Sequence, residues 1–365
     1  MKKEIDIIIP AYKAHNTIFK TLCSIAEQTF SQKIQVTIIN DCCPEGNYKK
    51  IIDLFKGQLD IKEIKLKENG GPGVARQFGL ANTKLPYVMF MDADDCFMGP
   101  YIVSQLVNVL KEKNEDVLFS NFIEEHENDK YVQHFKDRVW MFGKIYKREF
   151  LNHNKIKFSN RRANEDTCFN KMVLLTYQNQ DKELPYLEVF TYGWNYKENS
   201  ITRVNNAQYT YDQCMCGYID GMIEVYEWAD RMNIKEKIVK DSIYSEMCFI
   251  YISFCDVAKE AEYYQKQNFE YIKKFYHKVW KKYIKDFPNE DFLNIYDNCL
   301  SIAIHEGQAS PRTFIAQPNF MQFIEMLENV PYDENEIYKV WAEMPAEIKQ
   351  NNIDCGVVDK NYYNK

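Results

Sequence analysis

Residues Tyr87–Asp95 read Tyr-Val-Met-Phe-Met-Asp-Ala-Asp-Asp, an apolar run that ends in three carboxylates. The apolar part is typical of a strand buried on both faces of a parallel sheet. Open α/β sheets bind ligands at the carboxyl ends of their strands, which is where these acids lie. Asp92 and Asp94, one residue apart, suit a hard divalent cation that is also held by substrate phosphates. The stretch therefore predicts a metal-bound nucleotide diphosphate, although acids after a strand commonly form a solvated turn or a helix cap.

The composition is that of an ordinary soluble globular protein, with 45% hydrophobic and 27% charged residues. With 365 residues, the chain is long enough for two domains that each have a core. The N-terminus lacks the longer apolar segment of a signal peptide, and no later stretch is apolar enough to span a bilayer. These features predict a cytoplasmic protein with no integral membrane segment, and a peripheral position at the inner membrane face stays open.

The charge and the cysteines exclude further classes of function. A formal net charge of -7 disfavours a large contact with nucleic acid, so we expect no nucleic-acid partner. Lysines and arginines gather between Lys144 and Arg162, and a solvated face is the usual meaning of such a cluster. The 11 cysteines are odd in number, and close pairs such as Cys42-Cys43 lack zinc-finger spacing. We therefore expect reduced, mostly buried thiols and no structural zinc.

Strand and helix patterns alternate through the first hundred residues. The predicted strands cover residues 5–9, 36–39, 61–66 and 85–91, and the predicted helices cover residues 18–28, 48–55 and 72–81. This alternation predicts a parallel sheet with helices on both faces. Right-handed crossovers then bring the residues that follow each strand to one edge of the sheet. The residues expected at this edge are Tyr12, Asp41, Gly70, Gly71, Arg76, Asp92 and Asp94.

Two of the loops at this edge have a functional and a structural interpretation. Asp41 comes directly after the second strand, where it could accept a hydrogen bond from a nucleobase or simply stabilise a turn or helix cap. The glycines of residues 68–79 allow the backbone to approach a ligand closely. The helix that they open presents unpaired N–H groups of the kind that bind phosphate or ribose. The structural alternative is a tight strand-to-helix reversal.

Four motifs, in this order and spacing, resemble family 2 of the nucleotide-sugar glycosyltransferases. They are residues 9–12 (Ile-Pro-Ala-Tyr), 40–41 (Asn-Asp), 69–76 (Asn-Gly-Gly-Pro-Gly-Val-Ala-Arg) and 91–95 (Met-Asp-Ala-Asp-Asp). The resemblance implies a GT-A fold in which Asp41 receives the base, Asp92 the ribose, and Asp94 a divalent metal, Mn²⁺ or Mg²⁺, on the diphosphate. The nucleotide-binding residues that it implies are Pro10, Tyr12, Asp41, Gly70, Gly71, Arg76, Asp92 and Ala93.

The resemblance also implies a catalytic base. Glu165 and Asp166 precede an amphipathic helix predicted at 169–175, where members of the family place this base. Inverting transfer needs a carboxylate within hydrogen-bond reach of the acceptor hydroxyl, and this role falls to Asp166, with Glu165 orienting it or the acceptor. The structural alternative is a helix N-terminus stabilised by acids, and both can hold at once.

Two further segments extend the resemblance. Residues 140–151 are similar to the segment that walls the acceptor side in such enzymes, although packing by Trp140 and Phe150 explains most of them equally well. Residues 196–203 resemble the loop that closes over the diphosphate, where Lys197, Ser200 and Arg203 could donate to phosphate. Here the sequence departs from family members that use a histidine just before this loop.

Beyond residue 205 glycines become rare and apolar residues recur at a spacing of three to four, which predicts a helical domain. We therefore expect a catalytic α/β domain of GT-A type, with a mostly parallel sheet, at residues 1–205 and a smaller all-α domain at 206–365. Acceptor recognition and homodimer formation are both open as the role of the second domain. Its aromatic residues at 244–287 are interpreted as core packing.

Taken with the resemblance, the sequence predicts an inverting, metal-dependent glycosyltransferase. It would move a sugar from a nucleotide-sugar donor, with a UDP-sugar favoured, to a hydroxyl of a glycan or surface-polymer precursor. A nucleotidyltransferase would also use a metal at the sheet edge but needs a lysine-rich glycine loop, which we do not find. A non-catalytic module that binds a nucleotide-sugar or a glycan is the third interpretation. It would be unaffected when Asp166 is replaced by asparagine.

Overall fold

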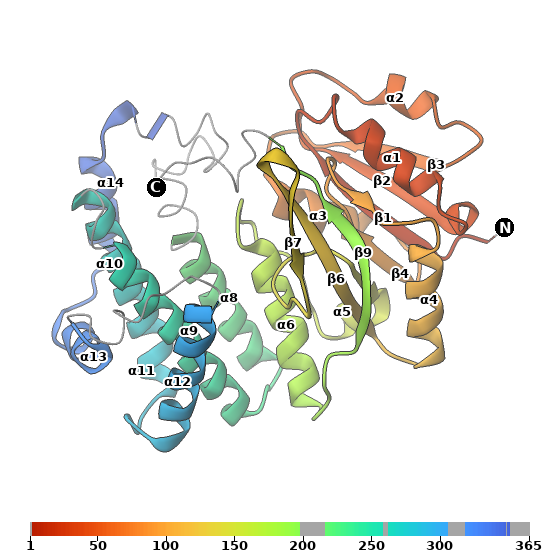
Figure 1. The fold of residues 1–365 in the computed structure, drawn as a ribbon. Coiled ribbons are helices and arrows are strands. Elements are labelled where there is room, and N and C mark those ends of the chain that lie inside the picture. Colours follow the sequence, from red (N-terminus) through yellow and green to blue (C-terminus); the bar gives the residue numbers. More distant parts are fainter. Residues whose placement is uncertain (1, 198–215, 258–261, 306–317, 348, 351–365) are drawn as a thin grey trace. The chain divides into compact units, whose positions relative to one another are not determined.

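The computed structural model describes residues 2–197, 216–257, 262–305, 318–347 and 349–350 (Figure 1). The chain divides into two compact units, Met1–Arg203 and Val204–Lys365. The strands of the first unit are β1 (Ile5–Ala11), β2 (Ile34–Asn40), β3 (Asp60–Lys65), β4 (Tyr87–Phe90), β5 (Cys96–Phe97), β6 (Val117–His126), β7 (Lys130–His134), β8 (Lys144–Lys147) and β9 (Tyr186–Trp194). Its α-helices are α1 (Ile18–Ala26), α2 (Lys49–Asp53), α3 (Pro72–Asn82), α4 (Ile102–Glu112), α5 (Arg148–His153) and α6 (Glu165–Asn179).

One nine-stranded sheet runs through the first unit in the order β3-β2-β1-β4-β8-β6-β9-β5, with β7 paired to β6. The strands β3, β2, β1 and β4 are parallel to one another, and β6 is parallel to β9. The remaining neighbours are antiparallel, including β8 between β4 and β6. The α/β fold predicted from the sequence is confirmed, and the structure adds the antiparallel strands that follow β4.

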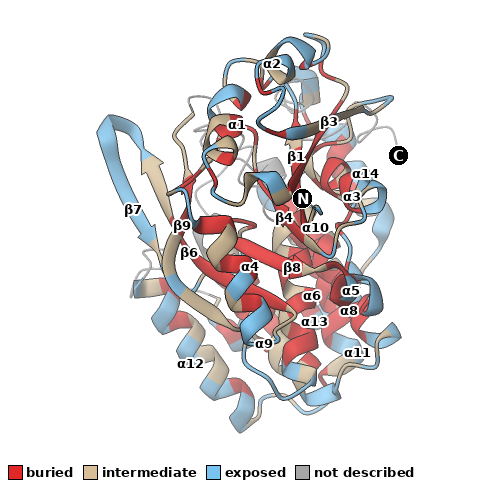
Figure 2. Cartoon of the chain, turned by 90° about the vertical axis from the view of Figure 1, so that its right-hand side faces the viewer, coloured by how far each residue is buried: buried red, intermediate tan, exposed pale blue. Residues whose placement is uncertain are grey.

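Alternate residues of β1 show how helices cover both faces of the sheet. Ile5, Ile7 and Ile9 are fully buried and share a core with Leu22 of α1 and Leu106 of α4. Ile8, which lies between Ile7 and Ile9, faces α3 on the other side of the sheet, next to Gly79. Burial on both faces explains why the sequence of this central strand is almost continuously apolar. Figure 2 shows the contrast between the buried strand β1 and the exposed strand β7.

Helix α3 approaches the sheet closely through Gly79. A Cβ atom at Gly79 would lie 2.4 Å from Cγ2 of Ile8 and 3.2 Å from Cγ1 of Ile39. Overpacking of this kind costs up to about 3 kcal/mol, and the gain in helix propensity returns about 1 kcal/mol. We therefore expect Gly79→Ala to lower the free energy of unfolding by about 1–2 kcal/mol in chemical denaturation. Gly99→Ala is the matched control, since a Cβ atom there meets nothing within 4 Å; equal midpoints would contradict the prediction.

Two of the cations that lie between Lys144 and Arg162 are buried. Lys144 on β8 is fully buried and donates from Nζ to Oδ1 of Asp137 at 3.0 Å. Arg148, at the start of α5, donates to Oδ2 of Asp6 on β1 at 2.9 Å. The interpretation of this cluster as a solvated face is therefore wrong for Lys144 and Arg148, because each has a carboxylate partner that the local sequence pattern does not reveal.

The second unit is helical, as predicted. Its helices are α8 (Tyr218–Arg231), α9 (Glu236–Val257), α10 (Glu262–Phe275), α11 (Lys281–Tyr283), α12 (Glu290–His305), α13 (Phe320–Asn329) and α14 (Glu334–Glu343), with a π-helix at Tyr276–Trp280. Tyr244, Tyr251 and Phe275 are buried, which supports their interpretation as packing residues. Acceptor recognition and homodimer formation by this unit remain predictions.

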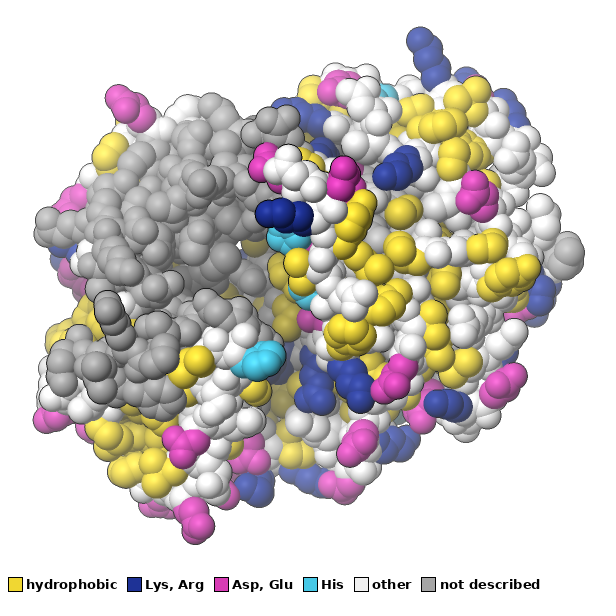
Figure 3. All heavy atoms as spheres, viewed as in Figure 1, with side chains coloured by type: hydrophobic (Ala, Val, Ile, Leu, Met, Phe, Trp, Pro, Cys, Tyr) yellow, Lys and Arg dark blue, Asp and Glu magenta, His cyan; other side chains and the backbone are white. Residues whose placement is uncertain are grey.

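The surface and the helices give two further findings. On the face drawn in Figure 3, the described lysine and arginine side chains are interspersed with aspartate and glutamate side chains. None of the helices in the described part of the chain combines the length and the apolar composition that crossing a lipid bilayer requires.

Candidate active site at the carboxyl ends of the strands

The acidic turn after β4 is held in place by β9. The carboxylate of Asp95 is buried and accepts hydrogen bonds from the hydroxyl of Tyr192 at 2.6 Å and the backbone N–H of Asn195 at 3.0 Å. The Asn195 side chain donates to the carbonyl oxygen of Asp94 at 2.6 Å, and the backbone N–H of Asp92 donates to the Tyr192 hydroxyl at 3.1 Å. Burial raises the pKa of Asp95. Asp95 therefore braces the turn, while Asp92 and Asp94 stay partly exposed for a ligand.

A buried guanidinium joins this turn to the acidic start of α6. Arg76 on α3 is 4% exposed and donates from Nη2 to Oδ1 of Asp92 at 2.5 Å. Its Nη1 donates to the carboxylate of Glu165, which lies in the first turn of α6. Although burial opposes its charge, Asp92 and Glu165 raise the pKa of Arg76. Arg76 thus links Asp92, which is predicted to bind the ribose, to Glu165 of the predicted catalytic pair.

Asp166 lies beside Glu165 in the same first turn, so both acids belong to the helix that the sequence predicted to begin at 169. Oδ1 of Asp166 accepts the backbone N–H of Thr167 at 2.8 Å, and Oδ2 has no hydrogen-bond partner among the described residues. Burial raises the pKa of Asp166, and the charge of Arg76 opposes this shift. Burial, and then the neighbouring Asp166 charge, also raise the pKa of Glu165. A carboxylate with a raised pKa and a free oxygen is well suited to accept a proton.

Asp41 organises the glycine loop that precedes α3. Its Oδ1 accepts the N–H of Gly70, and its Oδ2 accepts the N–H of Gly71, both at 2.8 Å. The side chain of Asn69 also donates to Oδ2, at 3.0 Å. A carboxylate accepts about four hydrogen bonds, so one position remains for the predicted nucleobase. Burial raises the pKa of Asp41.

Arg162 braces the same loop from the segment before α6. Gly71 has a φ of 85°, and a Cβ atom there would lie 2.8 Å from Cγ of Arg162. The guanidinium of Arg162 donates to Oδ1 of Asn69 at 2.7 Å and to its carbonyl oxygen at 2.9 Å. Only glycine combines this left-handed backbone with so close a neighbour. Contacts from Asp41, directly after β2, and from Arg162, before α6, therefore fix the shape of the loop.

The remaining predicted residues that the structure describes lie at the end of β1, in the acidic turn and after β9. Pro10 ends the apolar part of β1, and Tyr12 follows it with 42% of its surface exposed. Ala93 is buried within the acidic turn. Lys197 places Nζ 3.1 Å from Oδ2 of Asp94. Burial raises the pKa of Asp94 and Lys197 opposes this shift. The last two predicted phosphate ligands, Ser200 and Arg203, lie outside the described residues.

The oxygen donor at Asp94 fits the predicted divalent cation. Its carboxylate already has a cation, the ammonium of Lys197, at 3.1 Å. Mg²⁺ is held by one or two carboxylates and by substrate phosphates, not by a full cage of protein ligands, and carboxylate also suits Mn²⁺. In the part of the chain that the structure describes, three metal-ligating side chains converge within 4.8 Å at a different place, namely at His15, Cys43 and Glu45.

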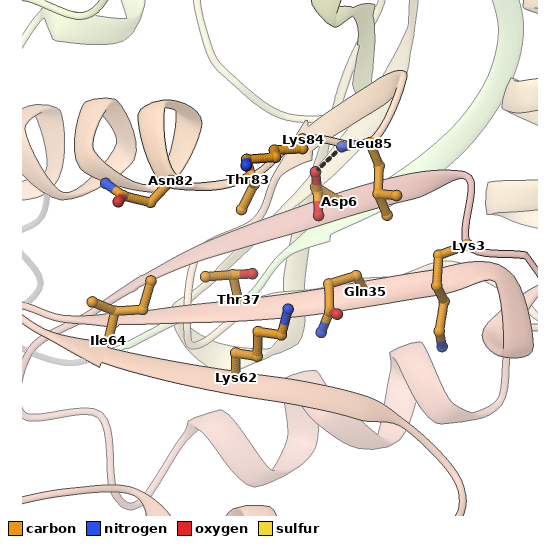
Figure 4. A pocket seen from close by; sticks show the side chains of 10 residues that line it. All are labelled: Lys3, Asp6, Gln35, Thr37, Lys62, Ile64, Asn82, Thr83, Lys84 and Leu85. Atoms are coloured by element: carbon orange, nitrogen blue, oxygen red, sulfur yellow. Dashed lines mark hydrogen bonds between the residues drawn. The ribbon is translucent and has the colours of Figure 1, made fainter.

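A cavity of about 340 Å³ lies at the opposite, amino ends of β1 and β2. Figure 4 shows Asp6, Gln35 and Thr37 of the sheet among the residues that line this cavity, with the carboxylate of Asp6 accepting the N–H of Leu85. Asp6 is also paired with Arg148, as described above. This cavity is separate from the acidic turn. The carboxylate of Asp6, which lines it, already binds Leu85 and Arg148 and so stabilises the fold.

Three residues of the site were missed by the sequence analysis. Asp95 was noted only as the third acid of a run, because its partners are 97 and 100 residues further along the chain. Arg162 was counted as part of a solvated cluster, and it contacts Asn69 across 93 residues. Lys144 was placed in the same cluster, yet its buried charge opposes the raised pKa of Asp166. No local spacing signals these contacts, since each depends on the folded sheet.

Comparisons with known proteins find relatives for the part of the chain that carries these residues. Residues 6–169 match the model of Glycosyl transferase family 2. Poly(ribitol-phosphate) beta-N-acetylglucosaminyltransferase TarP of Staphylococcus aureus is 26% identical over 202 residues, which cover 50% of this chain and 61% of that protein. Glycosyltransferase GlyA of Streptococcus pneumoniae is 25% identical over 229 residues, which cover 55% of this chain and 32% of that protein. The aligned part thus spans about a third to three fifths of these relatives.

Solved structures share the fold. The crystal structure of S. aureus TarS 1-349 in complex with UDP matches with a TM-score of 0.59 and 18% identity, covering 83% of this chain and 92% of that chain. The same protein in complex with UDP-GlcNAc matches with a TM-score of 0.53 and 15% identity, covering 98% and 95%. The family match spans the acidic turn, the glycine loop and the first turn of α6, so the part of the chain that carries the site, residues 6–169, matches glycosyl transferase family 2.

Proposed function

We propose that this chain is an inverting, metal-dependent glycosyltransferase that moves a sugar from a UDP-sugar to a hydroxyl of a surface polymer. The observation that carries the proposal is the Asp92–Arg76–Glu165 link, which joins the acidic turn to the first turn of α6, where Asp166 lies. A donor whose ribose lies at Asp92 would direct its diphosphate toward Asp94, within reach of Lys197. Transfer chemistry needs these two ends, leaving group and base, at one place.

The relatives favour the donor and the acceptor class. TarP is named as a poly(ribitol-phosphate) N-acetylglucosaminyltransferase, and TarS was crystallised with UDP-GlcNAc. By analogy, we propose UDP-GlcNAc as the first donor to test and a polyol-phosphate polymer as the first acceptor. Fold analogy supports the reaction class better than the substrate. UDP-GlcNAc and a polyol-phosphate polymer are therefore the first members of a panel of donors and acceptors to be tested.

The proposed reaction is a single displacement. The acceptor hydroxyl attacks the anomeric carbon on the face opposite the diphosphate. Asp166 accepts the hydroxyl proton as the new C–O bond forms, and the electron pair of the broken bond leaves with the diphosphate. Lys197 donates to the diphosphate and stabilises its developing charge. A divalent cation bound at Asp94 would add Lewis-acid stabilisation of the same leaving group.

Thermal unfolding with nucleotide and metal tests the donor site. We expect UDP with Mn²⁺ to raise the melting temperature of the wild-type protein, since ligand at 100 times its Kd adds about 2.7 kcal/mol. Asp94→Asn should lose the part of this shift that needs Mn²⁺, because the amide removes the charged ligand. Asp53→Asn, an exposed carboxylate on α2, is the control and should behave as wild type. An equal Mn²⁺-dependent shift in Asp94→Asn would refute the metal assignment.

A further inference from the structure

His15, Cys43 and Glu45 form a cluster outside the machinery described above. His15 lies in the loop after β1, and the other two lie in the loop after β2. Nδ1 of His15 is 2.8 Å from Oε2 of Glu45 and 4.0 Å from Sγ of Cys43. All three ligand atoms lie within 4.8 Å of one another. The cluster therefore gathers one nitrogen, one sulfur and one oxygen donor around a small volume.

The second nitrogen of the ring fixes how His15 faces this volume. Nε2 is 3.1 Å from the carbonyl oxygen of Asn47, which can only accept, so Nε2 carries a proton. The ring also stacks on Tyr48, with centroids 4.2 Å apart and 20° between the planes. A histidine that binds metal commonly donates its other N–H to a backbone carbonyl in this way. Nδ1 then faces the Glu45 carboxylate at 2.8 Å, and either a proton or a metal ion lies between these two atoms.

Cys43 is held as firmly as the histidine. It is 1% exposed, its Sγ accepts the backbone N–H of Lys13 at 3.2 Å, and its own N–H donates to Oδ1 of Asn40 at 2.8 Å. The sulfur is thereby fixed on the side of the cluster that faces away from solvent. Glu45 completes the set from the exposed side. Entry of an ion is possible from that side because Glu45 keeps 52% of its side-chain surface exposed.

We propose that His15 Nδ1, Cys43 Sγ and the Glu45 carboxylate bind Zn²⁺, with water as the fourth ligand. Tetrahedral zinc, with bonds of about 2.0–2.3 Å, places its ligands about 3.3–3.8 Å apart, a spacing bracketed by the two distances to Nδ1. A mixed set of sulfur, nitrogen and oxygen donors selects Zn²⁺ over Mg²⁺ or Mn²⁺, which prefer oxygen alone. The proposal revises the expectation of no structural zinc, since its ligands come from two loops and lie 28 residues apart.

The ion would act by joining two loops and not by taking part in transfer. Tyr12 lies three residues before His15, and Asp41 lies two residues before Cys43. These are the residues predicted to contact the nucleoside. Zn²⁺ would thus fix the relative position of the two loops before any donor arrives. The site rests on its own geometry and stands whether or not the proposed transferase activity is found.

Cobalt provides a direct test, because a thiolate bound to Co²⁺ gives an intense near-ultraviolet charge-transfer band that other ligands do not produce. The full chain, freed of metal by a chelator, is titrated with Co²⁺ and then with Zn²⁺. We expect the band to saturate at one equivalent and to disappear when Zn²⁺ displaces Co²⁺. The band should be absent in Cys43→Ser and retained in Cys42→Ser, the adjacent cysteine, whose Sγ instead donates to the carbonyl oxygen of Lys67.

Two further variants test the site independently if Cys43→Ser folds poorly. Glu45→Gln changes an exposed side chain, so it should fold normally and bind Zn²⁺ at least tenfold more weakly than wild type. Asp94→Asn should keep the cobalt band, which separates this site from the predicted nucleotide metal. A band that persists in Cys43→Ser, or a folded wild-type protein with neither a band nor a Zn²⁺-dependent rise in melting temperature, overturns the proposal. If the folded wild-type protein shows neither effect, a proton on Nδ1 of His15 would explain its short distance to the Glu45 carboxylate.

Discussion

Asp166→Asn is expected to lower kcat by about 10²–10⁴-fold, the usual contribution of a general base. The amide cannot take up the proton of the acceptor hydroxyl, although it keeps the size of the carboxylate and the hydrogen bond from Thr167. Nucleotide affinity should stay close to that of the wild type, because the direct contacts of the acidic turn run through Arg76 and Glu165. The measurement is the rate of UDP release with saturating donor and acceptor, alongside calorimetric titration of UDP.

The pH profile makes this prediction specific. Burial raises the pKa of Asp166, and a base works only when ionised, so the rate should rise with pH through that pKa. The folded state binds this proton more tightly than the unfolded chain, so the contribution of Asp166 to stability falls over the same interval. In Asp166→Asn the rise in rate should disappear, and the fall in stability should shrink to the part that Glu165 contributes. Wild-type turnover in Asp166→Asn would contradict the assignment, whereas no turnover in either protein, with UDP bound equally well by both, would favour a binding module without catalysis.

Arg76→Met is expected to lower the free energy of unfolding by about 3–5 kcal/mol, because it leaves the Asp92 and Glu165 carboxylates without their shared counter-ion. The methionine fills most of the same volume, so the loss reports the charge more than a cavity. Chemical denaturation at neutral pH measures it. The loss should shrink on acidification, since the two carboxylates then take up protons and no longer need the guanidinium.

Two variants test whether the network is the cause. The double variant Arg76→Met, Glu165→Gln should recover part of the lost stability, because it removes one of the uncompensated charges. Lys56→Met breaks an exposed pair with Asp53 and should cost no more than about 1 kcal/mol. If Arg76→Met cost as little as Lys56→Met, water rather than the guanidinium would be solvating the two acids.

The first half of the fold was predictable because its signals are local. Each buried strand is a short apolar run, and each ends in a polar residue that parallel topology carries to the same edge, as for Asp41 and Asp92. The boundaries moved by a few residues, most clearly at α6, which begins at Glu165. Helix start signals are weak where the residue before the first turn adopts a left-handed backbone, as Asn164 does with a φ of 61°.

The contacts that complete the site were not predictable in the same way. Asp95 meets Tyr192, and Lys144 becomes fully buried, only once β8 and β9 have joined the sheet. Pairing between strands this far apart in the chain leaves no periodic trace in the sequence. The cluster of His15, Cys43 and Glu45 escaped for the same reason, since spacing rules recognise ligands within one loop and these come from two.

The carboxylates around the acidic turn also outnumber the cations beside them, and this affects how substrate arrives. Asp92, Asp94 and Glu165 share only two cations, Arg76 and Lys197, and a diphosphate that enters the proposed donor site would approach these acids. Two like charges 4 Å apart repel by about 4 kcal/mol near a protein surface. A free nucleotide would therefore meet an electrostatic barrier that its metal chelate would not. The site would select its donor during the diffusional encounter, by net charge and before base or sugar has been recognised.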